Sequence, residues 1–149
     1  MADSSAAFDA CIDEYRRAAR DFCAVAERFA PKAFLAERPS DDPDCVSPLA
    51  VCRHVVRGAH GYANYLRKAQ GILTVPFVER VKGQADVRPA IDAAIAFTAE
   101  SCAPMRKLPG DDVLKVEFRV SWGSTYNPEI LLEHAICHLL RHRRQLERW

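Results

Sequence analysis

The feature of this chain that most restricts its fold is the spacing of apolar residues between positions 8 and 29. They recur at alternating steps of four and three residues: Phe8, Ile12, Tyr15, Ala19, Phe22, Ala26 and Phe29. This spacing puts them along one face of an α-helix, as in helices that pack nearly parallel to their neighbours. We therefore predict a long first helix, closed by Pro31, whose apolar seam is covered by other helices.

Capping residues and apolar spacing predict three further helices. Ser47-Pro48 supplies an N-cap and a first-turn proline for a helix that ends near Gly71. Apolar residues at helical spacing predict a third helix from about Arg88, which Pro104 ends or bends. Asn127 caps a last helix that runs to Trp149. Residues 72–86 are expected to form a loop with one short turn.

An extended segment is predicted directly before the last helix, between Leu114 and Trp122. Apolar residues alternate strictly with polar ones there, which is the period of a strand with one buried face. One strand forms no sheet by itself, so this segment either lies along the helices or pairs with residues 73–78. The expected fold is all-α, a four-helix bundle formed by one domain over residues 1–149.

The composition limits the classes of function. Hydrophobic residues make up 49% of the 149 residues, and 21 Lys and Arg balance 20 Asp and Glu to a net charge of +1. Proteins that neutralise a phosphate backbone carry a clear basic excess, so nucleic acid is an unfavoured partner. No apolar run is long enough to span a bilayer, and the first residues do not resemble a secretory signal. We expect a soluble protein of the cytoplasm.

Six cysteines are expected to be reduced, structural thiols rather than disulfides. The chain has no CxxC pair, which excludes ribbon-type zinc sites and thioredoxin-like redox motifs. Most of them stand among aliphatic residues, where a free thiol behaves as a small buried hydrophobe. They are Cys11, Cys23, Cys45, Cys52, Cys102 and Cys137.

Three of the five histidines recur at intervals of four residues on the last predicted helix: His134, His138 and His142. Side chains four residues apart lie one above the other on a helix face, and two imidazoles so placed can bind one metal ion. At ~100° per residue, His142 points toward the apolar face and His138 lies at its border, whereas His134 turns toward solvent. Any ion bound inside the bundle therefore lies between His138 and His142.

A firmly held metal needs a third ligand, and His54 on the second helix is the best candidate. Ala50, Gly58 and Gly61 occupy its face of that helix, so another helix can approach closely or a cavity can form there. His60 lies about 240° around the same helix and cannot face the same site. We expect His60 to have a structural role.

These residues resemble the DinB/YfiT-like family of bacterial four-helix-bundle proteins, which are regarded as metal-dependent enzymes. The similarity rests on Ser47, Pro48, Leu49 and His54 in SPLAVCRHVV, and on His138, His142, Arg143 and Gln145 in HLLRHRRQ. In layout it extends over nearly the whole chain. Two departures are Arg144, where many members have glycine, and His134, an additional histidine that we expect outside the first ligand shell.

The resemblance implies one divalent metal, zinc or nickel, held by His54, His138 and His142 with positions open for water or substrate. Such an ion lowers the pKa of a bound thiol or water, so it can serve a thiol S-transferase or a hydrolase. A low-molecular-weight thiol is the cofactor that the resemblance favours, and a small molecule the expected substrate. Family members are often dimers, which leaves a homodimer open.

No catalytic base is assigned from the sequence, because Glu133 points away from the ligand face. Tyr62, Trp122 and Tyr126 are candidates for lining the pocket, although aromatic residues at such positions are more often core. Two other interpretations remain: a partner- or DNA-binding bundle that uses the basic end of the last helix, and a folded family member without activity. Arginines near a helix C-terminus also complement its dipole, which is the simpler explanation of that end.

Overall fold

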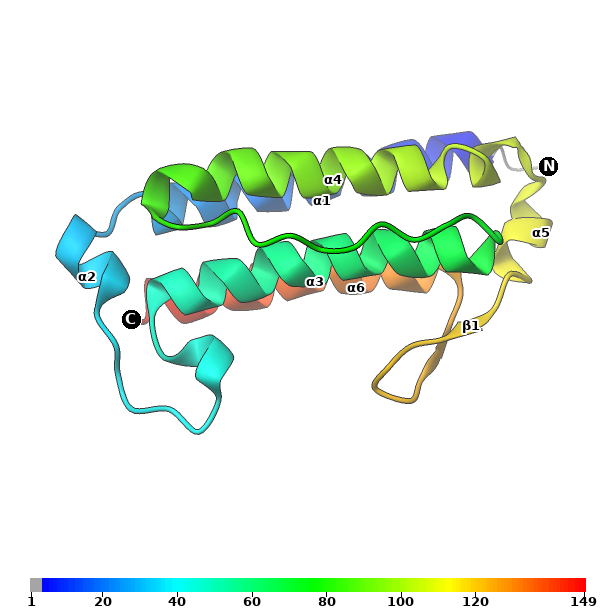
Figure 1. The fold of residues 1–149 in the computed structure, drawn as a ribbon. Coiled ribbons are helices and arrows are strands. Elements are labelled where there is room, and N and C mark those ends of the chain that lie inside the picture. The colour runs from blue at the N-terminus through cyan, green and yellow to red at the C-terminus, as the bar shows by residue number, and fades with distance from the viewer. Residues whose placement is uncertain (1–3) are drawn as a thin grey trace.

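The computed structural model describes residues 4–149 and is predominantly helical, so the prediction of an all-α chain is confirmed. Four long helices lie side by side: α1 (Ser4–Ala26), α3 (Pro48–Ala69), α4 (Val87–Cys102) and α6 (Pro128–Glu147) (Figure 1). Shorter elements connect them: α2 (Pro31–Leu35), η1 (Pro43–Cys45), η2 (Gln84–Asp86), η3 (Met105–Lys107), α5 (Gly110–Leu114), β1 (Phe118–Arg119) and β2 (Thr125–Tyr126).

The four long helices enclose the apolar core. Both α1 and α3 contact α4 and α6, so each long helix packs against two neighbours. The seam predicted on the first helix is buried from Phe8 to Ala26, and only its last member, Phe29, is partly exposed. Burying such a stripe supplies most of the stability of a helix of this length, since isolated helices are marginal in water.

A long loop with one short helical turn joins α3 to α4, as the sequence predicts for residues 72–86. The two helices run in the same direction, so the chain must return along them before α4 begins (Figure 1, green). The 22 residues of α3 extend over ~33 Å, a distance that about ten residues of extended chain can span. Val81 is fully buried and anchors the segment, and η2 is the short turn that ends it.

The end of the first helix differs from the prediction. Helix α1 stops at Ala26 rather than near Phe29, and Pro31 begins the short helix α2 instead of only closing α1. Proline suits the first turn of a helix because its missing N–H would have no partner there. Phe34 of α2 is buried and contacts Phe29 edge-on, with ring centroids 6.4 Å apart, so α2 covers the end of the core.

Of the two alternatives for the extended segment, the pairing with residues 73–78 is not formed. Leu114 ends helix α5, and only Phe118 and Arg119 form a strand, which pairs antiparallel with Thr125 and Tyr126. Gly123, at φ +96°, lets the chain reverse directly after Trp122. A partner six to eight residues away costs little loop entropy, whereas residues 73–78 lie along α3 and α4. We call this element, residues 118–126, the hairpin.

Candidate metal centre

Two histidines of the last helix face the interior on successive turns. Asn127 starts α6 by accepting a hydrogen bond from the backbone N–H of Ile130 at 2.9 Å, followed by Pro128 in the first turn. His138 and His142 are only 7% and 5% exposed, and their ring centroids are 4.5 Å apart. Both imidazoles are thus buried. The helical-wheel geometry predicts this for His142 and places His138 at the border of the apolar face.

Helix α3 brings a third imidazole to the same place. The Ser47 hydroxyl accepts a hydrogen bond from the backbone N–H of Ala50, which sets the start of α3. His54, two turns further along, places its Nε2 2.9 Å from Nε2 of His138, and its ring centroid is 4.9 Å from that of His142. One ring nitrogen from each of the three histidines lies within 4.8 Å of the others. The structure therefore brings His54, His138 and His142 into one cluster, which we call the histidine centre.

The outer nitrogens of two of these rings are held by acceptors. Nδ1 of His54 lies 3.0 Å from Oδ2 of Asp44, and Nδ1 of His142 lies 2.7 Å from Oε1 of Gln145. A carboxylate only accepts, so Nδ1 of His54 carries the hydrogen and Nε2 presents a lone pair to the centre. The same assignment at His142 follows from the amide oxygen of Gln145. Such contacts fix the tautomer and orientation of histidines that bind metals.

Asp44 is the site residue that the sequence analysis missed. It lies in η1, where the side chain of Asp42 accepts a hydrogen bond from its backbone N–H at 2.9 Å. Its other carboxylate oxygen accepts from Arg57 at 2.7 Å, and this hydrogen bond holds the pKa of Asp44 below its usual value. Arg57 lies almost one turn beyond His54 on α3, so one carboxylate bridges two residues of the same helix.

Burial keeps the inner rings neutral. Desolvation, followed by the neighbouring His142 and His54, lowers the pKa of His138 to about 3. The pKa of His142 is also lowered, again mainly by burial, although its hydrogen bond to Gln145 opposes the shift. Neutral imidazole is the form that binds a metal ion, so no proton need leave these two rings near neutral pH.

His134 lies beside the histidine centre but does not belong to it. Its ring stacks on Trp122 of the hairpin, with centroids 5.0 Å apart, and its Nδ1 is 3.2 Å from the hydroxyl of Tyr126. Its ring centroid is 6.4 Å from that of His138. His134 therefore lines the approach to the centre together with the hairpin.

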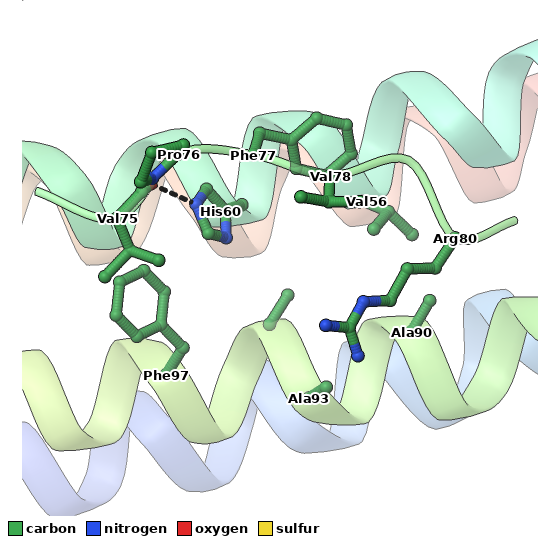
Figure 2. A pocket seen from close by; sticks show the side chains of 11 residues that line it. Val56, His60, Val75, Pro76, Phe77, Val78, Arg80, Ala90, Ala93 and Phe97 are labelled. Atoms are coloured by element: carbon green, nitrogen blue, oxygen red, sulfur yellow. Dashed lines mark hydrogen bonds between the residues drawn. The ribbon is translucent and has the colours of Figure 1, made fainter.

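His60 lines a second pocket, between α3, α4 and the segment that connects them (Figure 2). Its Nε2 donates to the carbonyl oxygen of Val75 at 2.7 Å, and its ring stacks on Phe97 of α4 with centroids 4.9 Å apart. This pocket of about 230 Å³ is lined mainly by apolar side chains of α3, α4 and the connecting segment. A partly buried position with a backbone partner agrees with the structural role expected of His60.

An open cavity of about 550 Å³ leads to His54 and His138. Two of the three aromatic residues considered from the sequence, Tyr62 and Trp122, line it. The third, Tyr126, contacts the rings of Trp122 and His134 instead. Gly58 lies against the centre, because a Cβ atom there would stand 3.2 Å from Cε1 of His138. A Cβ atom at Gly61 would meet nothing within 4 Å, so this glycine leaves room in the cavity.

Comparison with protein-family models and with curated proteins gives no match. No helix within residues 4–149 combines the length and apolar character needed to cross a membrane. All six cysteines are free in the structure. Burial raises the pKa of the Cys23 and Cys102 thiols to about 11 and about 12, and Cys137 is the one that is exposed.

Proposed function

We propose that this chain is a metal-dependent enzyme of the DinB/YfiT-like four-helix-bundle type. His54, His138 and His142 would hold one divalent ion, zinc or nickel, and the site would act on a thiol or on water. The observation that carries this proposal is the meeting of three ring nitrogens from two helices within 4.8 Å, two of the rings being oriented by Asp44 and Gln145.

The donor set fits a divalent metal. At metal–nitrogen distances of ~2.0–2.2 Å, two neighbouring ligand atoms stand about 3.0–3.5 Å apart. Nε2 of His54 and Nε2 of His138 are 2.9 Å apart, so a small movement would suffice to admit an ion. In residues 4–149, this is the one group of three potential ligands close enough to share an ion. Imidazoles suit zinc and nickel better than magnesium or calcium.

An ion held by three neutral imidazoles keeps its full double charge, which lowers the pKa of a bound thiol or water toward neutrality. The protein contributes the rest of the site. Asp44 and Gln145 orient two of the rings. Burial of His138 and His142 disfavours their protonated forms, so protons compete less with the metal for the ring nitrogens. The open cavity of about 550 Å³ gives a small molecule access from the side of Trp122.

The nucleic-acid alternative loses part of its support, because two of the four arginines near the end of α6 are paired with acidic residues. Arg143 pairs with Asp21 and with Glu147, and Arg144 also pairs with Glu147. Arginines engaged in this way offer little free charge to a phosphate backbone.

Elemental analysis of protein purified without a tag and without chelators tests the proposal. We expect nearly one divalent ion per chain, and loss of that ion in His138→Ala. His60→Ala is the control, because it also replaces an imidazole by a methyl group but at a position outside the histidine centre. Wild-type protein that neither retains nor takes up a divalent ion would refute the proposal.

Thiol and water chemistry are separated by a second measurement on the metal-loaded protein. If the site takes a thiol, low-molecular-weight thiols should raise the melting temperature and their S-methyl analogues should not. Equal effects of both would leave the hydrolase-like alternative as the better account.

A further inference from the structure

One arginine at the histidine centre lacks an acidic partner. Arg141 lines the cavity, and its guanidinium nitrogen lies 3.5 Å from Nε2 of His142. On α6 it stands three residues after His138 and seven after His134, so the three share one face of the helix. No carboxylate within residues 4–149 forms an ion pair with it. A guanidinium that lines a cavity and has no acidic partner in the protein is a binding group for an anion.

The neighbouring arginines differ from Arg141 in this respect. Arg57, which also lines the cavity, is bound to Asp44 at 2.7 Å, and Arg143 and Arg144 pair with acidic residues. In the metal-free protein one positive side-chain charge therefore remains without an acidic partner at the cavity, and it matches a ligand that carries one negative charge. A carboxylate meets that condition and fits the planar fork of a guanidinium.

Part of the cavity lining is aromatic. Trp122 is 46% exposed and meets the rings of Tyr62 and Tyr65 edge-on, at centroid distances of 6.3 and 6.0 Å. The Tyr65 hydroxyl accepts a hydrogen bond from the backbone N–H of Ser121 at 2.7 Å, which ties the hairpin to α3. These rings form a fixed apolar surface, suited to a flat, apolar ligand body.

We propose that the cavity binds a small organic monocarboxylate with a flat apolar body. Its carboxylate would pair with Arg141, and its body would pack against Trp122 and Tyr62 above the space left by Gly61. This inference rests on the proposed function, since it names the substrate class of the same site. It also makes Arg141 a residue that determines specificity.

Trp122 provides the readout. In a Trp149→Phe background it is the one remaining tryptophan, and its fluorescence reports ligands in the cavity. The probes are benzoate and benzamide, a charged and a neutral ligand of nearly equal shape, and phenyl phosphate as a dianion. We expect benzoate to bind about tenfold more tightly than benzamide, and at least as tightly as phenyl phosphate.

Two substitutions and one control variant test the assignment. Arg141→Gln should make the affinities for benzoate and benzamide equal, whereas the control Arg144→Gln should leave the tenfold preference intact. Gly61→Leu should weaken both ligands by filling the cavity. A benzoate preference that persists in Arg141→Gln would overturn the inference, as would equal binding of both probes by the parent protein or stronger binding of phenyl phosphate.

The benzoate and benzamide titrations of the parent protein and its variants are compared without metal, because a bound divalent ion would itself favour a carboxylate over an amide. Metal binding is measured separately, which separates this inference from the proposed function. A benzoate preference in a protein that binds no metal would refute the metal proposal and support the anion site. A protein that binds metal but does not distinguish benzoate from benzamide would refute the anion site alone.

Discussion

The two histidines of helix α3 show how differently the same side chain is used on two sides of one element. His54 directs one ring nitrogen at the carboxylate of Asp44 and the other at His138. His60, six residues later, donates to a backbone carbonyl and stacks on Phe97 in an apolar pocket. A ring with an outer acceptor and an inward lone pair is prepared for a metal.

The comparison shows that the surroundings of a histidine, rather than its presence on a helix, indicate its chemistry. Around His54 the protein supplies two further imidazoles, a carboxylate and a glycine that lets His138 approach. Around His60, the aromatic and aliphatic side chains offer no second ligand. Substitutions of one of these histidines, or of a residue next to His54 or His138, therefore should have different effects on metal binding and stability.

Removal of a ligand should have the largest effect. Each of three histidines contributes about 3 kcal/mol to the binding of a divalent ion, so His54→Ala should lower the affinity by ~100- to 1,000-fold. His60→Ala should leave it unchanged. Isothermal titration calorimetry with zinc on metal-free protein measures both. An equal loss of zinc affinity in the two variants would contradict the assignment of His54, and not His60, as a metal ligand.

Removal of the carboxylate behind His54 should have the next largest effect. Asp44→Asn keeps the size of the side chain but weakens the acceptor that fixes the tautomer, so zinc affinity should fall by ~10- to 100-fold. Asp92→Asn makes the same charge change at an exposed position of α4 and is the matched control. An unchanged affinity in Asp44→Asn would mean that the His54 ring is held by its packing alone.

The histidine centre should make the metal-free protein sensitive to acid. Burial lowers the pKa of His138 to about 3, whereas an unfolded histidine titrates near ~6.5. Between these values the unfolded chain binds a proton that the folded chain does not, so the free energy of unfolding falls as pH drops. The loss should approach about 1 kcal/mol per pH unit below ~6.

Denaturant unfolding of wild type, His138→Gln and His60→Gln at several pH values measures this effect. His138→Gln should reduce the slope of stability against pH, and His60→Gln should keep it. A wild-type curve that is flat between pH 6.5 and 4.5 would contradict the account.

The smallest change in zinc affinity is expected when alanine replaces a glycine of α3, and it should differ between Gly58 and Gly61. Gly58→Ala places a Cβ atom 3.2 Å from Cε1 of His138, so the ring must move and zinc affinity should fall about fivefold. Gly61→Ala meets open space and should leave the affinity unchanged. Both lose a flexible glycine from a helix, which favours folding by ~0.5–1 kcal/mol. Parallel calorimetry and thermal melts compare the pair, and equal zinc affinities would contradict the close approach at Gly58.

The sequence predicts the parts of this structure that depend on local periodicity. The long helices follow from apolar spacing and from caps such as Ser47 and Asn127, and the relation of His138 to His142 follows from helix geometry alone. The choice of His54 as the third ligand does not follow from helix geometry alone. It depended on the small residues around His54 and on the resemblance to a family. The role of these histidines as metal ligands stays a prediction.

The remaining features depend on where loops travel, which local patterns do not specify. Asp44 stands ten residues before His54 in a polar, proline-rich segment, and nothing in that spacing indicates that η1 folds back onto α3. The partner of the extended segment could not be predicted for a related reason. Alternation predicts an extended backbone but not its partner, and Gly123 decided the partner by reversing the chain at once.

Crystals of the metal-loaded, untagged protein test the central claim most directly, through anomalous diffraction measured at the absorption edge of the ion. The account predicts one strong peak per chain, ~2.0–2.2 Å from one ring nitrogen each of His54, His138 and His142, with Asp44 still bound to the outer nitrogen of His54. A peak at His60, a peak shared by His134 and His138 without His54, or no peak after loading would contradict it.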